Sequence, residues 1–295
     1  VALLFKSLAP LFGIGALTML AGNMEVVTRN VRYSWSIVFY IMAGIHFFIW
    51  LWHSIFLPGG RQPVVGKKNL FGLHRYDHTK AVDLMMQGWR NRLMLCFFTG
   101  FMLPLSLTVI IVPLFLIDMT HNGGLSLAPQ EVGLALGTIG VAAIFAGRWA
   151  GSLAIRRCGW KKWIVPMALA LLAYTLLLEN LSSNIAYSLF KVCAVMMAGG
   201  AALGFGSNAY TAIVDLFASK GGRQFRRATA ASLSTAATIA AGIFAGLVQM
   251  DIGYRQFFII AIASGVASVI LAVIFFVFRG KISANSENCA TFATK

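Results

Sequence analysis

Ionisable side chains inside long apolar stretches are the residues of this sequence that could do chemistry in a hydrophobic environment. Arg148 lies in the stretch 130–154, and Lys191 and Asp215 lie in 185–217. A charge at the centre of a membrane helix costs at least about 2.5–3.5 kcal/mol on insertion scales. Arg148 could pair with a solute carboxylate or with an acid on a facing helix, and Lys191 could bind an anionic solute. Asp215 could hold a proton if desolvation raised its pKa.

Each of these residues also has a structural interpretation. The long side chains of Arg148 and Lys191 could extend to the headgroups at the two membrane surfaces. Asp215 could form an ion pair with Lys220 or Arg223 at the cytoplasmic rim. The sequence leaves both interpretations open for all three residues.

Asn208 and Tyr210 form the best candidate region for solute binding, because they follow a run of glycines within one apolar stretch. These are Gly199, Gly200, Gly204 and Gly206. Glycines in a membrane helix permit close approach or local unwinding, and unwound backbone occurs only beside protein or a watery cavity. Asn and Tyr could then hydrogen-bond a sugar or peptide. A polar contact between helices would give the same pattern. We group Asn208 and Tyr210 with Arg148 and Lys191 as candidate substrate-binding residues.

Three residues are candidates for proton coupling. Asp215 is the first, Glu25 lies at the outer end of the first apolar stretch, and His46 lies at mid-depth in the second. An unperturbed imidazole has a pKa near 6.5, which suits proton transfer. A neutral, hydrogen-bonded His46 is the structural alternative.

Composition indicates the environment of these residues. The chain has 295 residues, of which 59% are hydrophobic and 11% charged, and its mean hydropathy is +0.79. Soluble domains carry about 25% charged residues. Blocks such as Val266–Phe278 are apolar on every face, which favours helices over barrel strands. The sequence predicts an all-α polytopic membrane protein with apolar stretches at 5–23, 33–57, 93–117, 130–154, 163–179, 185–217, 228–249 and 256–278.

The positive charges predict an orientation. The chain carries 24 Lys and Arg against 9 Asp and Glu. If the loop 58–92 is cytoplasmic, 19 of the 24 cations lie inside and only Arg29, Arg32 and Arg255 lie outside, as the positive-inside rule requires. The excess of positive charge is thus explained by the orientation of the chain in the membrane, and we expect no nucleic-acid partner. The basic loop is expected to contact anionic lipid headgroups. The inside cations are Lys6, Arg61, Lys67, Lys68, Arg75, Lys80, Arg90, Arg92, Arg156, Arg157, Lys161, Lys162, Lys220, Arg223, Arg226, Arg227, Arg279, Lys281 and Lys295.

Motifs for cofactors, metals and common hydrolases are missing from the sequence. It holds no GxxxxGK[ST], GxSxG or HExxH, and its four cysteines form no CxxC. His74 and His78 have a spacing that could hold a metal on a helix, but cationic neighbours oppose it. We expect no cofactor, no metal and no enzyme activity. A polytopic membrane enzyme without a local motif remains an alternative.

Paired small residues at four-residue spacing recur at Gly133/Gly137, Gly147/Gly151, Gly200/Gly204 and Gly242/Gly246. Such pairs let membrane helices approach each other closely.

A loop motif resembles one of the major facilitator superfamily. Gly147-Arg148-Trp149-Ala150-Gly151, followed by Arg156-Arg157-Cys158-Gly159-Trp160-Lys161-Lys162, resembles the loop between helices eight and nine of that family, although the usual loop Asp is absent. A closer resemblance is to AmpG-like muropeptide permeases, in the branch that also contains acetyl-CoA transporters. It is carried by Ala21-Gly22-Asn23-Met24-Glu25-Val26, Tyr33-Ser34-Trp35-Ser36, Phe39-Tyr40, Ala43-Gly44, His53, Leu57-Pro58, Leu127–Leu134, Lys162-Trp163, Pro166-Met167, Gly253-Tyr254 and Phe257-Phe258.

The resemblance implies a major facilitator-type helix bundle. Residues 1–57 would be the last two helices of a six-helix half, 58–92 the central cytoplasmic loop, 93–279 the second six-helix half and 280–295 a cytoplasmic tail. Compared with the twelve-helix plan, four helices would be missing before the first apolar stretch, and a start at Val1 without an initiator Met is expected of a fragment. About eight of twelve membrane helices would then be present.

The resemblance also implies a function. AmpG-like proteins import anhydro-sugar peptides, with protons as the expected driving ion. We therefore expect a secondary active transporter in the bacterial inner membrane, with a muropeptide or amino-sugar conjugate as its small-molecule solute. A major facilitator transporter for a sugar, organic anion or drug is the alternative.

Overall fold

The computed structural model describes residues 9–56, 89–183, 188–218 and 223–278. All regular secondary structure in this part of the chain is helical, which confirms the all-α prediction. Two segments, η1 and η3, are π-helices, and η2 is a short 3-10 helix. The elements are η1 (Leu11–Leu17), α2 (Thr18–Thr28), α3 (Val31–Phe56), α5 (Trp89–Gly100), α6 (Leu103–Ile117), η2 (Thr120–Asn122), α7 (Pro129–Val132), η3 (Gly133–Gly140), α8 (Val141–Cys158), α9 (Trp160–Ser183), α10 (Leu189–Ala218) and α11 (Arg223–Val277).

Seven helices in the described part of the chain are long and apolar enough to cross a membrane. They are Leu11–Thr28, Val31–Phe56, Arg92–Ile117, Pro129–Cys158, Trp160–Ser183, Leu189–Phe217 and Arg227–Val277. Crossing a hydrocarbon core about 30 Å thick takes about 20 helical residues, and about 17 are enough in some cases. The chain is a multi-pass membrane protein.

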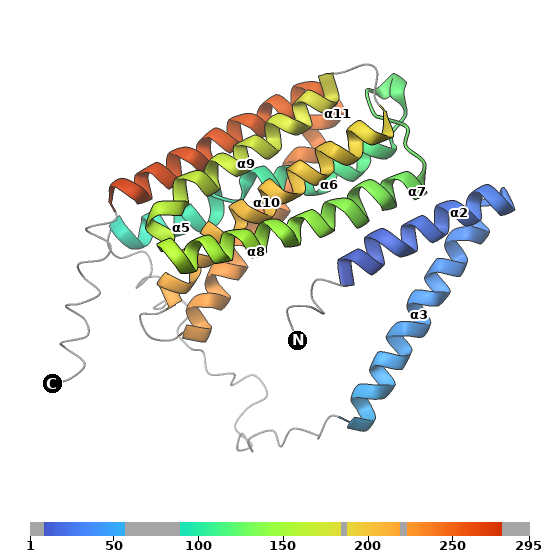
Figure 1. Cartoon of the computed structure of the whole chain (residues 1–295), viewed down its shortest axis with the longest axis horizontal. Helices are drawn as coiled ribbons and strands as arrows, with labels where there is room; N and C mark the ends of the chain where they lie inside the picture. The colour runs from blue at the N-terminus through green and yellow to red at the C-terminus, as the bar shows by residue number, and fades with distance from the viewer. Residues whose placement is uncertain (1–8, 57–88, 184–187, 219–222, 279–295) are drawn as a thin grey trace. The chain divides into compact units, whose positions relative to one another are not determined.

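The last helix, α11, reverses its direction at Gly253, where φ is 76° and ψ is 172° (Figure 1). Thr238, before the reversal, hydrogen-bonds Ser106 at 3.0 Å. Ser268, after it, donates to the carbonyl oxygen of Phe101 at 2.8 Å. A straight helix would separate residues 238 and 268 by about 45 Å, yet both contact one short stretch. The two halves of α11 therefore account for the predicted stretches 228–249 and 256–278.

Helix α10 is unbroken from Leu189 to Ala218, so its glycine-rich middle is not unwound. Gly200 and Gly204 instead bring α10 against the continuous helix of η3 and α8, while Gly199 and Gly206 face α9. A Cβ on Gly200 would lie 2.6 Å from the carbonyl oxygen of Gly140, and one on Gly204 would overlap the carbonyl oxygen of Ile144. A Cβ on Gly147 would likewise overlap the carbonyl of Ala201. The two backbones touch, as predicted for small residues at four-residue spacing.

The π-helices η1 and η3 make a second glycine contact. A Cβ on Gly133 would lie 2.7 Å from Cγ of Met19, and one on Gly137 would overlap the carbonyl oxygen of Ile14. Thr138 Oγ1 donates to the carbonyl of Gly133 at 3.1 Å, five residues earlier. The Gly133/Gly137 pair thus also packs closely. Gly246 behaves differently, because a Cβ there would meet nothing within 4 Å.

Aromatic side chains fill the core between α5, α6 and the second half of α11. Phe97 stacks on Phe101 with ring centroids 4.4 Å apart, and Phe275 lies 4.7 Å from Phe97. Phe115 and Phe258 meet edge to face at 5.2 Å. All five rings are completely buried.

Residues Leu20–Leu93 form a separate compact unit. Its described part contains most of α2 and all of α3, joined at Arg29, which has a φ of 51°. Asn30 Oδ1 accepts a hydrogen bond from the backbone N–H of Tyr33 at 3.1 Å and so caps the first turn of α3. Most side chains of α3 are exposed, including those of Phe47 and Trp50.

The loop that follows α6 is held by the carboxylate of Asp118. Its Oδ1 accepts from the backbone N–H of Met119 at 2.8 Å and from Nδ2 of Asn122 at 3.1 Å. Its Oδ2 accepts from the hydroxyl of Tyr254 at 3.0 Å, directly after the reversal at Gly253. The donors on Asn122, Met119 and Tyr254, in that order, lower the pKa of Asp118 below its usual value.

This lowered pKa predicts a pH-dependent stability. The contribution of Asp118 is complete above its unfolded-state pKa of about 3.9 and is lost as the pH falls through the lower folded-state pKa. We expect Asp118→Asn to lower the unfolding temperature by a few degrees at pH 7, with the difference from the unchanged protein shrinking below about pH 4. Thermal unfolding in detergent between those pH values measures this. Asp251→Asn, at an exposed acid of α11, is the control. A difference that stays constant with pH would contradict the assignment.

Candidate functional site

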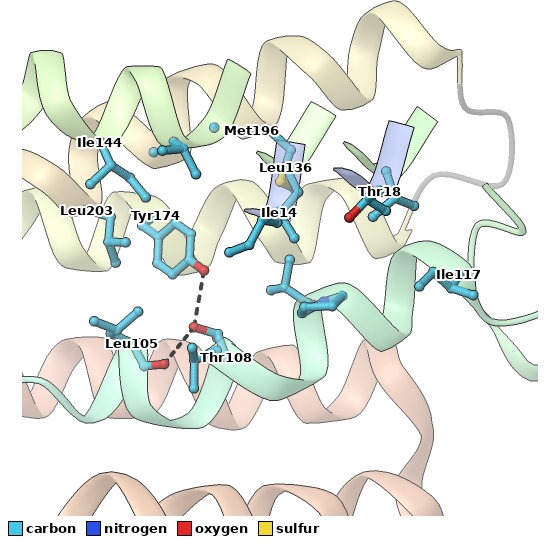
Figure 2. A pocket seen from close by; sticks show the side chains of 17 residues that line it. Ile14, Thr18, Leu105, Thr108, Ile117, Leu136, Ile144, Tyr174, Met196 and Leu203 are labelled. Carbon is cyan, nitrogen blue, oxygen red and sulfur yellow. Dashed lines mark hydrogen bonds between the residues drawn. The ribbon is translucent and has the colours of Figure 1, made fainter. Parts of the chain in front are cut away.

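A cavity of about 440 Å³ lies between α6, α9, α10 and the continuous helix of η3 and α8 (Figure 2). Its volume is within the usual range of ligand pockets, about 300–1,000 Å³. Leu203, halfway along α10, and Ile144 of α8 line the end nearest the middle of these helices. The lining residues are Ile14, Thr18, Leu105, Thr108, Val109, Val112, Pro113, Ile117, Val132, Leu136, Gly140, Val141, Ile144, Tyr174, Met196, Gly200 and Leu203.

The cavity wall is almost entirely hydrocarbon. Of the 17 lining residues, only Thr18, Thr108 and Tyr174 have polar side chains, and none is charged. The hydroxyl of Tyr174 points toward Thr108 and donates to its Oγ1 at 3.2 Å (Figure 2). Oγ1 of Thr108 in turn donates to the carbonyl oxygen of Pro104 at 2.7 Å. The donor groups of these two buried hydroxyls are therefore already used.

A polar cluster joins α8 to α10 next to this cavity. Nε of Arg148 donates to Oγ of Ser207 at 3.2 Å, and that hydroxyl donates to the carbonyl of Gly204 at 2.8 Å. Nδ2 of Asn208 lies 3.2 Å from the carbonyl oxygen of Arg148 and 3.0 Å from that of Gly204. Ser207 and Asn208 are buried, whereas the side chain of Arg148 is exposed. Among the described residues no carboxylate forms an ion pair with Arg148.

The cavity and the cluster are neighbours along both helices. Arg148 follows the lining residue Ile144 by four positions on α8, and Ser207 follows Leu203 by four on α10. Residues four apart share a helix face and are separated by about one turn, or 5.4 Å. Arg148 therefore lies about one helical turn beyond the end of the cavity.

The other candidate residues of α10 lie elsewhere. The half-buried Tyr210 donates its hydroxyl to the carbonyl oxygen of Ala230 at 3.1 Å, which ties α10 to α11. Asp215 is exposed and forms an ion pair with Arg227 at 2.5 Å. Lys191 lies near the start of α10, about 25 Å along the axis from Asn208.

Glu25 and His46 belong to the separate unit of Leu20–Leu93. Glu25 is half-buried on α2. His46 is exposed on α3, with Nδ1 2.8 Å from the carbonyl oxygen of Met42 one turn earlier. Of the seven residues predicted for solute binding or proton coupling, only Arg148 and Asn208 are in direct contact. The described ranges contain no group of three or more His, Cys, Asp or Glu side chains suited to a metal. His74 and His78 lie outside them.

None of the residues that line the cavity was predicted from the sequence, and neither was Ser207 of the polar cluster. Ser207 directly precedes Asn208 and could have been included with it. Thr108 and Tyr174 carry hydroxyl groups and lie in separate apolar stretches. No local sequence pattern indicates that α6 and α9 bring these two side chains together.

No family model, curated protein or solved structure matches the chain. An apolar cavity beside a cation can hold a ligand that has an apolar part and an acidic group.

Proposed function

We propose that the protein is a secondary active transporter of the major facilitator type, which exposes one site alternately to the two sides of the membrane. The observation that carries the proposal is the cavity beside Arg148 within a bundle of membrane-crossing helices. Transporters bind their solutes near the bilayer midplane, between helices that move relative to each other. The position of Leu203 and Ile144, near the middles of α10 and of the η3–α8 helix, is consistent with such a site.

The proposed solute is a muropeptide or an amino-sugar conjugate, imported with protons across the bacterial inner membrane. Its support is the resemblance of the sequence to AmpG-like permeases. The alternative is another small solute, and the hydrocarbon wall of the cavity favours an organic anion over a sugar.

The proposed roles of the residues follow their positions. Arg148 binds an acidic group of the solute, and Asn208 maintains the contact of α8 with α10 beside it. We assign Lys191 and Tyr210 to stages of transport at which the solute is farther from Arg148. Asp215, Glu25 and His46 are the candidate proton carriers. Asp215 forms an ion pair with Arg227 that links α10 to α11.

Uptake into cells that express the protein tests this function. We expect accumulation of radiolabelled muropeptide that a protonophore abolishes. Arg148→Gln should reduce kcat/KM about tenfold or more, because the solute's acid would lose its charged partner. Arg156→Gln, at an exposed cation of the same helix, should leave uptake unchanged. Accumulation that is equal in both variants would remove Arg148 from the site. Chemical conversion of the solute without accumulation would instead indicate a membrane enzyme.

A further inference from the structure

We infer that the ligand of this site is an amphiphilic organic acid, with its apolar group in the cavity and its carboxylate at Arg148. The inference rests on the proposed transport function and, within it, favours the alternative solute class, an organic anion, over the muropeptide. It makes the bound molecule an anion with a hydrocarbon or aromatic part, in place of a uniformly polar sugar.

The lining of the cavity selects the apolar part. Hydroxyl groups of a sugar would lose their hydrogen bonds to water when they entered the cavity, and a buried polar group without a partner is unfavourable. The wall offers few replacements, because the donor of Tyr174 is used by Thr108 and the donor of Thr108 by Pro104. A hydrocarbon group needs no such partners and gains from leaving water.

Arg148 selects the acidic part. Nε of its guanidinium donates a hydrogen bond to Ser207. Arg148 has no acidic partner in the part of the chain that the structure describes. The two Nη groups remain suited to a carboxylate, which arginine binds through parallel hydrogen bonds. Because Arg148 lies one turn beyond Ile144 on the same face of α8, a single small molecule can reach both the cavity and the cation.

A binding series tests the two parts of the ligand separately. The 295-residue chain is placed in lipid nanodiscs, and radiolabelled acetate, butanoate, hexanoate and octanoate are bound at equilibrium, with empty nanodiscs subtracted. Each methylene that enters the cavity should strengthen binding about fourfold. Arg148→Gln should weaken octanoate binding about tenfold or more and leave the binding of octanol, which has no charge, unchanged. The control Arg156→Gln should leave the binding of both octanoate and octanol unchanged.

A pair of substitutions on α6 tests the position of the apolar part. Val109 and Leu114 are exposed to similar extents, 47% and 48%, but only Val109 lines the cavity. Val109→Phe should fill part of the cavity and reduce the preference for octanoate over acetate, whereas Leu114→Phe should preserve it. Both residues are partly exposed, so neither change overfills the core.

The outcomes separate the inference from the function on which it rests. Equal affinity for acetate and octanoate, or a chain-length dependence that survives Val109→Phe, would overturn the inference. Muropeptide uptake could still occur in that case. The expected binding pattern in a protein that moves no solute would support the ligand class and contradict transport.

Discussion

Replacing Gly204 with alanine is expected to separate α8 from α10 and to lower the unfolding temperature by about 10 °C, the equivalent of about 3 kcal/mol or more. The added Cβ would overlap the carbonyl oxygen of Ile144 and lie 3.0 Å from the backbone nitrogen of Arg148. These are backbone atoms, so no side chain can rotate away to make room. Circular dichroism during heating in detergent measures the change. Octanoate binding should fall with it, because Arg148 would move.

Gly246→Ala is the matched control for this prediction. Gly246 also lies within a membrane helix, but a Cβ there would meet nothing within 4 Å. Alanine favours a helix over glycine by about 1 kcal/mol, so stability should stay the same or rise slightly. Equal losses in both variants would mean that glycine matters only for membrane insertion, and not for the contact of α8 with α10.

Gly253→Ala should destabilise the protein by about 1–3 kcal/mol, because the reversal of α11 uses a backbone conformation that is essentially restricted to glycine. The φ of 76° with ψ of 172° places the residue in that region. Tyr254 follows Gly253 directly, so a backbone shift at residue 253 would also weaken the hydrogen bond of Tyr254 with Asp118. Guanidinium or SDS unfolding, followed by circular dichroism, measures the loss.

Gly123→Asn is the comparison for the reversal. Gly123 also has a positive φ, 83°, but its ψ of 9° lies in the left-handed helical region, which asparagine tolerates. We expect that variant to remain close to the unchanged protein. If Gly253→Ala is as stable as Gly123→Asn, the reversal does not depend on glycine.

Local properties of the sequence predicted most of the helices. Runs such as Val266–Phe278 are apolar whatever their partners, so the membrane-crossing stretches could be located without a structure. Glycine spacing predicted three of the four close contacts, because close backbone approach needs a missing side chain. The Gly242/Gly246 pair was the exception, since a Cβ on Gly242 would meet only the side chain of Ile110.

The cavity could not be predicted because it is made by side chains from distant parts of the chain. Thr108 and Tyr174 meet only when α6 lies beside α9, and nothing in either stretch encodes that pairing. The glycines of α10 were ambiguous for a similar reason. The same residues permit unwinding or tight packing, and the facing carbonyls of α8 decide between the two.

The π-helix η3 has a consequence for the glycines on either side of it. In a regular α-helix, at about 100° per residue, Gly133, Gly137, Gly147 and Gly151 would all fall on a single stripe and face one neighbour. A π-turn, with its i to i+5 bonds, adds one residue and shifts the angular phase of everything after it. The first pair thus meets Gly15 of η1, while the second meets α10. If Gly133–Gly140 became a regular α-helix without losing a residue, the two pairs would come back into phase and Arg148 would turn by about 100° relative to η1.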